Sequence, residues 1–215
     1  RIPVTEETVL FVPYEAKQAR LYTYSQGNKF DINEMPIINM YNQYFGGSMN
    51  AIVFQEMREK RSLAYTAQSR YSSANELDRY NYNYSYIATQ NDKVIDAFTA
   101  FNELFNEMPQ SQGAFDLAKE GALSSISTNR ITKSAIFAFY RSTQKMGIDY
   151  DYRKPLYEKL KTFTMNDIVD FNQKYIKNQK KTYMILARPT DMKFDVLESK
   201  FGKVQKLTLE DIFGY

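Results

Sequence analysis

The most regular pattern in this chain lies between residues 80 and 87, where every second side chain is a tyrosine. The segment reads Tyr80-Asn81-Tyr82-Asn83-Tyr84-Ser85-Tyr86-Ile87. A period of two places alternate side chains on opposite faces of a β-strand. Residues 63–71 also have strand character, and the polar stretch 72–78 separates the two segments. We therefore predict an antiparallel pair of strands in the middle of the chain.

The sheet face that these tyrosines occupy can be interpreted in two ways. A tyrosine has a large apolar body with one polar tip, which suits packing beneath a layer of helices, and we favour this interpretation. The alternative is that the tyrosines line a chamber that binds apolar peptide side chains.

The rest of the chain combines a few strands with many helices. Short apolar or alternating runs predict strands at 8–12, 19–25 and 182–187, with Gly27-Asn28 as a turn. Apolar residues at three- and four-residue steps predict most of the helices. We expect helices near 33–45, 49–60, 92–109, 112–129, 134–146, 155–162, 166–176 and 195–201, followed by a short extended tail.

Strands and helices follow one another without a regular β-α-β repeat. This order predicts an α+β fold, with a mostly antiparallel sheet that helices cover on one face. We find no internal repeat and no linker, so we expect one domain over residues 1–215, cut from a longer polypeptide. The ending Phe213-Gly214-Tyr215 is typical of a natural terminus, which favours a last domain.

The composition excludes several functions. The chain has no histidine and no cysteine, so it lacks the ligands from which most zinc sites are built, and it has no disulfides. It carries 28 basic and 25 acidic side chains, a net charge of +3, and the two signs are interspersed. No basic footprint for nucleic acid emerges, and we expect the tract 177–181 to be a solvated loop. No apolar run is long enough to cross a membrane.

Residues 46–65 combine a glycine pair, a helical stretch and a charged run. Gly46-Gly47 is expected to end the preceding helix in the left-handed cap conformation, and Ser48 to cap the next helix. The run that follows is Arg58-Glu59-Lys60-Arg61-Ser62-Leu63-Ala64-Tyr65. The pair Glu103 and Glu107 has helical i,i+4 spacing, and we expect it to be solvated rather than to bind a metal.

This segment resembles the zinc metallopeptidases that include pitrilysin, insulin-degrading enzyme and mitochondrial processing peptidase. Their domains that do not bind zinc often carry a Gly-Gly turn, a helix and then the run R-E-K-R-G-L-A-Y. The clear departure here is Ser62, where glycine is usual, and it should affect turn geometry more than chemistry. The resemblance implies that the zinc lies in another domain or subunit, on an inverted H-x-x-E-H helix.

The resemblance also implies roles for Arg58 and Tyr65, which match the family's substrate contacts in identity and spacing. Hydrolysis of a peptide bond develops negative charge on the carbonyl oxygen, which directed donors stabilise. We expect Tyr65 to support that oxygen and Arg58 to anchor the peptide backbone. The alternatives are that Arg58 pairs on the surface with Glu56 or Glu59, and that Tyr65 is a half-buried strand residue. Gly46 and Gly47 could also form a flexible substrate loop, although a helix cap is the simpler interpretation.

Two functions from different classes remain open. The first is a non-metal-binding domain of a zinc metalloendopeptidase, inactive alone, whose partners are a zinc-binding peptidase domain and a peptide substrate. The second is a scaffold or binding subunit derived from the same family. An inverted zinc motif in the parent chain or in a partner chain would distinguish the two. The setting that we favour is the bacterial periplasm.

Overall fold

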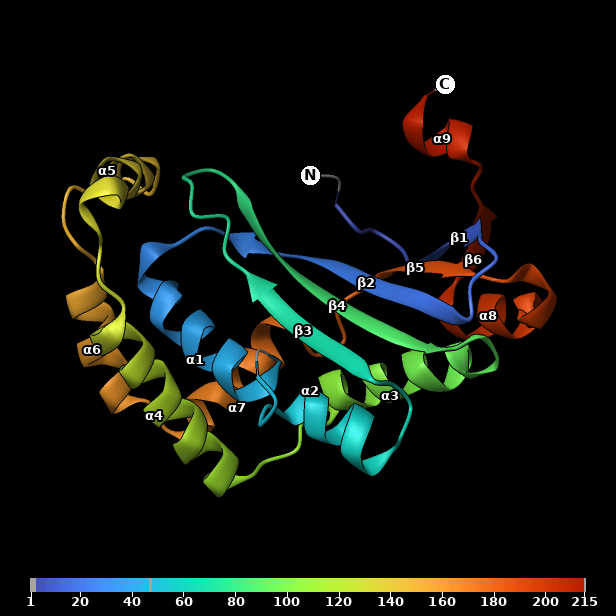
Figure 1. Cartoon of the computed structure of the whole chain (residues 1–215), viewed down its shortest axis with the longest axis horizontal. Helices are drawn as coiled ribbons and strands as arrows, with labels where there is room; N and C mark the ends of the chain where they lie inside the picture. Colours follow the sequence, from blue (N-terminus) through green and yellow to red (C-terminus); the bar gives the residue numbers. More distant parts are fainter. Residues whose placement is uncertain (1–2, 47, 215) are drawn as a thin grey trace.

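The computed structural model describes residues 3–46 and 48–214 and consists of a six-stranded sheet with helices packed against one face (Figure 1). The strand order is β3-β4-β2-β5-β1-β6. β2 pairs antiparallel with β4 and β5, and β3 pairs antiparallel with β4, whereas β1 is parallel to β5 and β6. The strands are β1 (Thr8–Pro13), β2 (Gln18–Lys29), β3 (Thr66–Ser72), β4 (Tyr80–Gln90), β5 (Thr182–Ala187) and β6 (Lys203–Lys206). The predicted α+β class and the central antiparallel pair are confirmed.

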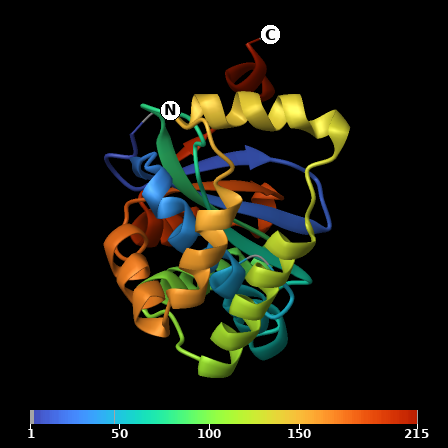
Figure 2. The same cartoon turned by 90° about the vertical axis from the view of Figure 1, so that its left-hand side faces the viewer.

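The helices form a layer below the sheet in Figure 1, apart from α5 and α9, which both views place on the other side (Figure 2). Short 3-10 turns precede several of them. The helical segments are α1 (Met35–Phe45), α2 (Ile52–Phe54), η2 (Gln55–Lys60), α3 (Val94–Asn106), α4 (Gln112–Thr128), α5 (Ile136–Lys145), α6 (Arg153–Thr162), α7 (Met165–Tyr175), α8 (Phe194–Phe201) and α9 (Leu209–Phe213).

The hydrophobic core lies between the helical layer and the sheet. Aromatic rings dominate it: Phe45 and Phe105 have centroids 5.8 Å apart, and Phe98 meets Tyr183 at 5.0 Å. Burial of this kind supplies most of the stability of a domain, at roughly 25 cal/mol per Å² of apolar surface. The core therefore holds the sheet and the helices in one arrangement.

The tyrosines of β4 lie on the sheet face away from the helices, so the favoured prediction was wrong. Along β4 the odd-numbered residues are buried, and the tyrosines from 80 to 86 are exposed or half-buried. Small polar side chains therefore point into the protein, where those of Asn81, Ser85 and Thr89 are hydrogen-bonded, whereas Asn83 Oδ1 has no partner among the described residues. Ser85 Oγ lies 2.5 Å from Thr23 Oγ1 on β2, and Asn81 Oδ1 accepts a bond from the backbone N–H of Ala74 at 2.9 Å. Burying a polar group costs little free energy once the group is hydrogen-bonded. A prediction made from the apolar character of tyrosine alone therefore placed the wrong face of β4 against the helices.

The end of α1 is fastened to the edge strand β3. Asn42 donates to the carbonyl oxygen of Tyr71 at 2.9 Å and accepts from its N–H at 2.8 Å. One turn later, a Cβ on Gly46 would lie 1.9 Å from the carbonyl oxygen of Ser69. Gly46 has φ −136°, which is not the predicted left-handed conformation. Glycine is required here by the close approach of two backbones and not by φ.

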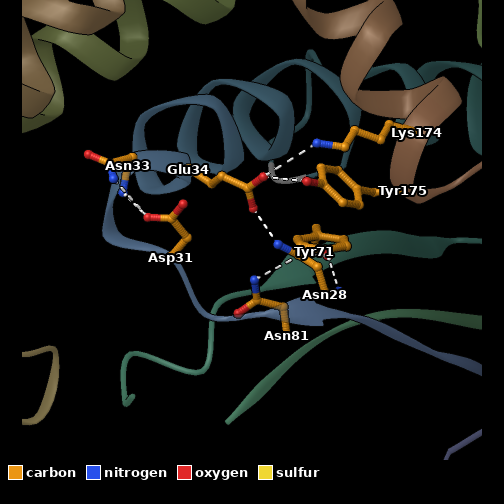
Figure 3. A network of polar contacts seen from close by, with 8 residues as sticks. All are labelled: Asn28, Asp31, Asn33, Glu34, Tyr71, Asn81, Lys174 and Tyr175. Atoms are coloured by element: carbon orange, nitrogen blue, oxygen red, sulfur yellow. Dashed lines mark hydrogen bonds and ion pairs between the residues drawn. The ribbon is translucent and has the colours of Figure 1, made fainter. Parts of the chain in front are cut away.

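A polar network joins the start of α1 to β2, β3, β4 and α7 (Figure 3). The Glu34 carboxylate accepts bonds from Asn28 and Tyr175, and it lies 3.9 Å from Lys174 Nζ. Asn28 in turn accepts from Tyr71 Oη at 2.5 Å. Since the Glu34 side chain is only 20% exposed, these bonds are shielded from water and stabilise the junction more than surface pairs would.

Several boundaries differ from the sequence predictions. Gly27-Asn28 is not a turn, because β2 continues through a bulge to Lys29, and a Cβ on Gly27 would lie 2.1 Å from Tyr71 Oη. Ser48 does not cap a helix, since α2 begins after Ala51 without a side-chain cap. The tail contains α9, where only extended chain was predicted.

Lys181, predicted to be solvated, is 4% exposed. Its ammonium donates to the Gln179 carbonyl at 2.9 Å and lies 5.5 Å from the centre of the Phe105 ring. Burial lowers the pKa of Lys181, and the nearby Glu7 carboxylate opposes that shift. Across residues 3–46 and 48–214, no helix combines the length and apolarity needed to cross a membrane.

Buried tyrosines should make the fold sensitive to alkali. Burial raises the pKa of Tyr41, Tyr71 and Tyr183, so the unfolded chain ionises these groups first, near pH 10. Stability should be full below pH 10 and fall above it, by up to about 1.4 kcal/mol per pH unit for each such group. Urea unfolding from pH 8 to 11, with absorbance at 295 nm, measures this. Tyr183→Phe should flatten the decline, with Tyr14→Phe as the matched control, and equal stability at pH 9 and 11 would contradict the prediction.

The Glu34 network gives a second prediction. Glu34→Gln keeps the shape of the side chain but removes its charge, so it weakens the bonds from Tyr175 and Asn28 and the attraction to Lys174. We expect a loss of about 1–2 kcal/mol in the free energy of unfolding. Glu120→Gln, on the surface of α4, is the control and should change stability by less than about 0.5 kcal/mol. Equal stabilities of the two variants in urea would show that the network does not stabilise the fold.

Candidate functional site

Arg58 and Tyr65 come together beside the edge strand β3. The guanidinium carbon of Arg58 lies 4.7 Å from the centre of the Tyr65 ring and 4.9 Å from that of Phe54. The cation is thus held between two aromatic rings, an arrangement that is attractive and restricts its orientation. The Arg58 side chain is 37% exposed and Tyr65 is 74% exposed. Both groups are open to a ligand.

The backbone around Arg58 is unusual. Residues Gln55–Lys60 form a π-helical segment, η2, and the N–H of Arg61 reaches back five residues to the Glu56 carbonyl at 3.2 Å. Segments of π-helix are frequent at functional sites. The segment ends at Lys60, and two residues later Ser62 has a φ of 49°, which lies in the left-handed region. This turn redirects the chain, so that Tyr65 reaches the ring-stacking position above Arg58.

Neighbouring charges fix this segment to the rest of the domain. Arg61 Nη1 lies 2.6 Å from Glu103 Oε2 on α3, and the Glu103 side chain is 51% exposed. Arg58 Nε lies 3.4 Å from Glu59 Oε1, which is one of the surface pairs considered for it. Because that pair engages only one nitrogen of a guanidinium with five N–H donors, Arg58 keeps further donors for a ligand.

A cleft of ≈380 Å³ opens next to these two side chains, and Gly46, Met49, Phe54 and Gln68 also line it. Met49 is 70% exposed. The outer edge of β3 borders the cleft: Tyr71 turns its backbone groups toward Asn42, away from β4. Because backbone direction alternates along an antiparallel strand, Ala67 presents its N–H and C=O to the same edge. The cleft thus combines a cation, a phenol, apolar walls and strand backbone.

Only Gly46 of the predicted glycine pair lies among the residues that the structure describes. Gly46 is buried against Ser69 and lines the cleft, so its packing role is clear. Gly47 lies outside the described residues. Sequence reasoning missed Phe54, which lies four residues before Arg58 on the same helical face. That i,i+4 spacing of an aromatic and a cation was the signal that could have found it.

Larger clefts occur elsewhere but lack this combination. One of ≈510 Å³ lies between the start of α1 and α6, lined by Pro36, Tyr152 and Leu156 among others. Within the part of the chain that the structure describes, no three His, Cys, Asp or Glu side chains are grouped to hold a metal. The described residues therefore do not offer the ligands of a zinc site.

Comparison with known proteins identifies the family. The family described as peptidase M16 inactive domain matches residues 2–122, which is more than half of the chain. The chain belongs to this family of non-catalytic peptidase domains. No curated protein matches.

Solved structures agree with this assignment at the level of the fold. A peptidase M16 inactive domain from Pseudomonas fluorescens aligns with a TM-score of 0.72 at 16% identity, covering 85% of this chain and 44% of that one. A protease from Helicobacter pylori aligns with a TM-score of 0.70 at 13% identity, covering 86% and 45%. A conserved protein from Enterococcus faecalis gives 0.70 at 14% identity, covering 88% and 44%. The chain therefore spans less than half the length of these proteins.

Ser62 provides a direct test of the local geometry. A left-handed residue with a Cβ costs about 1–2 kcal/mol, and glycine avoids that cost while adding roughly 0.4–1 kcal/mol of unfolded-state entropy. Ser62→Gly should therefore stabilise the domain by about 0.5–1 kcal/mol. Ser72→Gly, at the end of β3, is the control and should destabilise. Urea unfolding measures the free energy of unfolding of both variants. A destabilised Ser62→Gly variant would show that this residue is not left-handed in solution.

Proposed function

We propose that this chain is the non-metal-binding domain of a zinc metalloendopeptidase and that Arg58 and Tyr65 contact the peptide substrate. The zinc would be held by another domain of the same polypeptide or by a partner subunit. The observation that carries the proposal is the pairing of these two side chains, both exposed, at the mouth of a cleft beside a strand edge. The family assignment supports it.

The chemistry of the two groups suits complementary roles. As a peptide bond is cleaved, negative charge develops on its carbonyl oxygen, and a phenol hydroxyl is a single directed donor for such an oxygen. Arg58 offers a permanent charge and several donors, which suit backbone carbonyls or a carboxylate. Because Phe54 and Tyr65 flank the guanidinium, little orientational freedom is lost on binding. Tyr65 is thus assigned to the developing oxyanion and Arg58 to the peptide backbone.

The edge of β3 supplies a third element of recognition. Extended peptides bind to exposed strand edges through backbone hydrogen bonds, while neighbouring pockets select their side chains. Ala67 is placed to make such bonds, and Phe54 and Met49 form apolar walls beside it. The substrate class that fits is an extended peptide, held by its main chain, with an apolar side chain in the cleft.

The test uses the complete peptidase that contains this domain, together with any separate zinc-binding subunit. Tyr65→Phe removes only the donor and should lower kcat by about 10²–10³-fold, with little change in KM. Arg58→Ala should raise KM, because it removes binding to the substrate backbone, and should also lower kcat, because Tyr65 loses the contact that orients it. Kinetics on a fluorogenic peptide, with circular dichroism to confirm folding, measure both effects.

Arg79→Ala is the control, since it removes an arginine that pairs with Glu76 and does not line the cleft. It should retain kcat and KM. Wild-type kinetics for both Tyr65→Phe and Arg58→Ala would rule out the substrate-contact role. A parent assembly that lacks an inverted zinc motif and cleaves no peptide would instead favour the scaffold function.

A further inference from the structure

One methionine of this chain stands out by its exposure. Of the nine methionines, Met49 alone is largely exposed among the residues that the structure describes: it is 70% exposed, and the others are buried or half-buried. The chain has no cysteine and no tryptophan, so methionine sulfur is the group on this domain that a peroxide oxidises most readily. Because an exposed thioether meets an oxidant in solution directly, Met49 should react before the other methionines.

Met49 belongs to the candidate site and not to a remote surface. It lines the same cleft as Arg58 and Tyr65. Its carbonyl oxygen, in the turn between α1 and α2, accepts a hydrogen bond from Gln55 Nε2 at 2.8 Å. Gln55 begins η2, the segment that carries Arg58, so this bond ties the backbone of Met49 to that segment. A chemical change at the Met49 sulfur therefore changes a wall of the cleft.

The charges at the cleft favour the binding of a new acceptor. The residues that line it include one cation, Arg58, and no carboxylate. The two carboxylates of η2 are both paired, because Glu59 Oε1 lies 3.4 Å from Arg58 Nε and Glu56 pairs with Lys60 at 2.5 Å. A guanidinium has five N–H donors, so Arg58 can bond a further acceptor while it keeps its pair with Glu59.

We propose that Met49 is an oxidation site that regulates substrate binding at this cleft, an inference that rests on the proposed function. As a thioether, Met49 is an apolar wall for a side chain of the peptide. As a sulfoxide it is polar, and its new oxygen accepts a hydrogen bond from Arg58 and so occupies a donor that holds the peptide backbone. The polar wall also gives up the hydrophobic contact with the peptide. Oxidation therefore weakens substrate binding in two ways.

The oxidant of this step is hydrogen peroxide or another peroxide. A lone pair of the Met49 sulfur forms a bond to one oxygen of hydrogen peroxide, and the O–O bond breaks. The second oxygen takes the proton of the first and leaves as water, so that the sulfur is oxidised and the peroxide is reduced. Methionine sulfoxide reductases, each of which acts on one sulfoxide epimer, return the side chain to the thioether. The change is therefore reversible.

Peptide mass spectrometry after brief treatment of the complete peptidase with hydrogen peroxide measures where oxygen is added. Met49 should be oxidised faster than Met35, which is half-buried and lines the separate cleft beside α6. A peptide whose scissile amide is reduced to a methylene amine binds without being cleaved, and it should slow the oxidation of Met49 but not that of Met35. Equal rates for the two methionines, or equal rates at Met49 with and without the peptide, would overturn the proposal.

Kinetics on a fluorogenic peptide measure the consequence for binding. Peroxide treatment of the wild-type peptidase should raise KM about tenfold, because an apolar contact and a hydrogen bond are lost together, and the sulfoxide reductases should restore it. Met49→Leu, compared with its own untreated sample, should show little of this rise, since leucine is not oxidised. Met35→Leu is the matched control and should respond as the wild type does. An equal rise in KM for the wild type and Met49→Leu would overturn the proposal.

Arg58→Ala distinguishes a failure of this inference from a failure of the proposed function. Because this variant has no guanidinium to bond the sulfoxide, oxidation of Met49 should raise its KM by a smaller factor than in the wild type. Wild-type kinetics for both Arg58→Ala and Tyr65→Phe would contradict the proposed function. Impaired kinetics for these two variants, together with a wild-type KM that does not change when Met49 is oxidised, would overturn the inference alone.

Discussion

The contact between the end of α1 and the outer edge of β3 is the constraint on which the candidate site depends. Gly46 lies against the Ser69 carbonyl so closely that any side chain would collide with it, and Asn42 bonds both backbone groups of Tyr71. These contacts cover one end of the strand edge and leave the part near Ala67 open. They also fix where the chain leaves α1, and hence where η2 and Arg58 must lie. Gly46, which itself lines the cleft, thereby helps to set its geometry.

Two local departures from regular structure then bring Arg58 and Tyr65 together. In the π-helical turn the backbone hydrogen bonds span five residues instead of four, which changes the direction of the side chains along η2, and Arg58 lies over the Phe54 ring. Ser62, in a left-handed conformation that glycine would adopt more easily, reverses the chain toward β3. Strained or irregular backbone of this kind persists when surrounding contacts over-determine it. Here the Arg61–Glu103 ion pair and the ring stacking on Arg58 supply those contacts.

Helices and strands with a strong sequence periodicity were predicted well. The predictions failed where contacts between residues distant in sequence determine the local structure. The α+β class, the strand at 182–187 and the pairing of β3 with β4 were predictable from alternation and spacing. Four features could not be predicted from the sequence: the face of the tyrosines, the conformation of Gly46, the continuation of β2 through Gly27, and the burial of Lys181. Each depends on a partner distant in sequence, such as Thr23 for Ser85 or Ser69 for Gly46. The convergence of Arg58 and Tyr65 was anticipated from their spacing and the family resemblance, whereas Phe54 was not, because an aromatic on a helix usually belongs to the core.

On the proposed function, this domain contributes to catalysis through the orientation of Arg58 and Tyr65 and not through metal ligands. A phenol that is 74% exposed would ordinarily sample several rotamers, and its value as a donor would fall with that freedom. Stacking against Arg58, itself backed by Phe54, reduces the freedom of both groups before any ligand arrives. Donors that are oriented in advance need no reorganisation when charge develops on a substrate oxygen. The aromatic–cation–aromatic stack, rather than either polar group alone, is therefore the feature that would make this surface useful to a neighbouring catalytic domain.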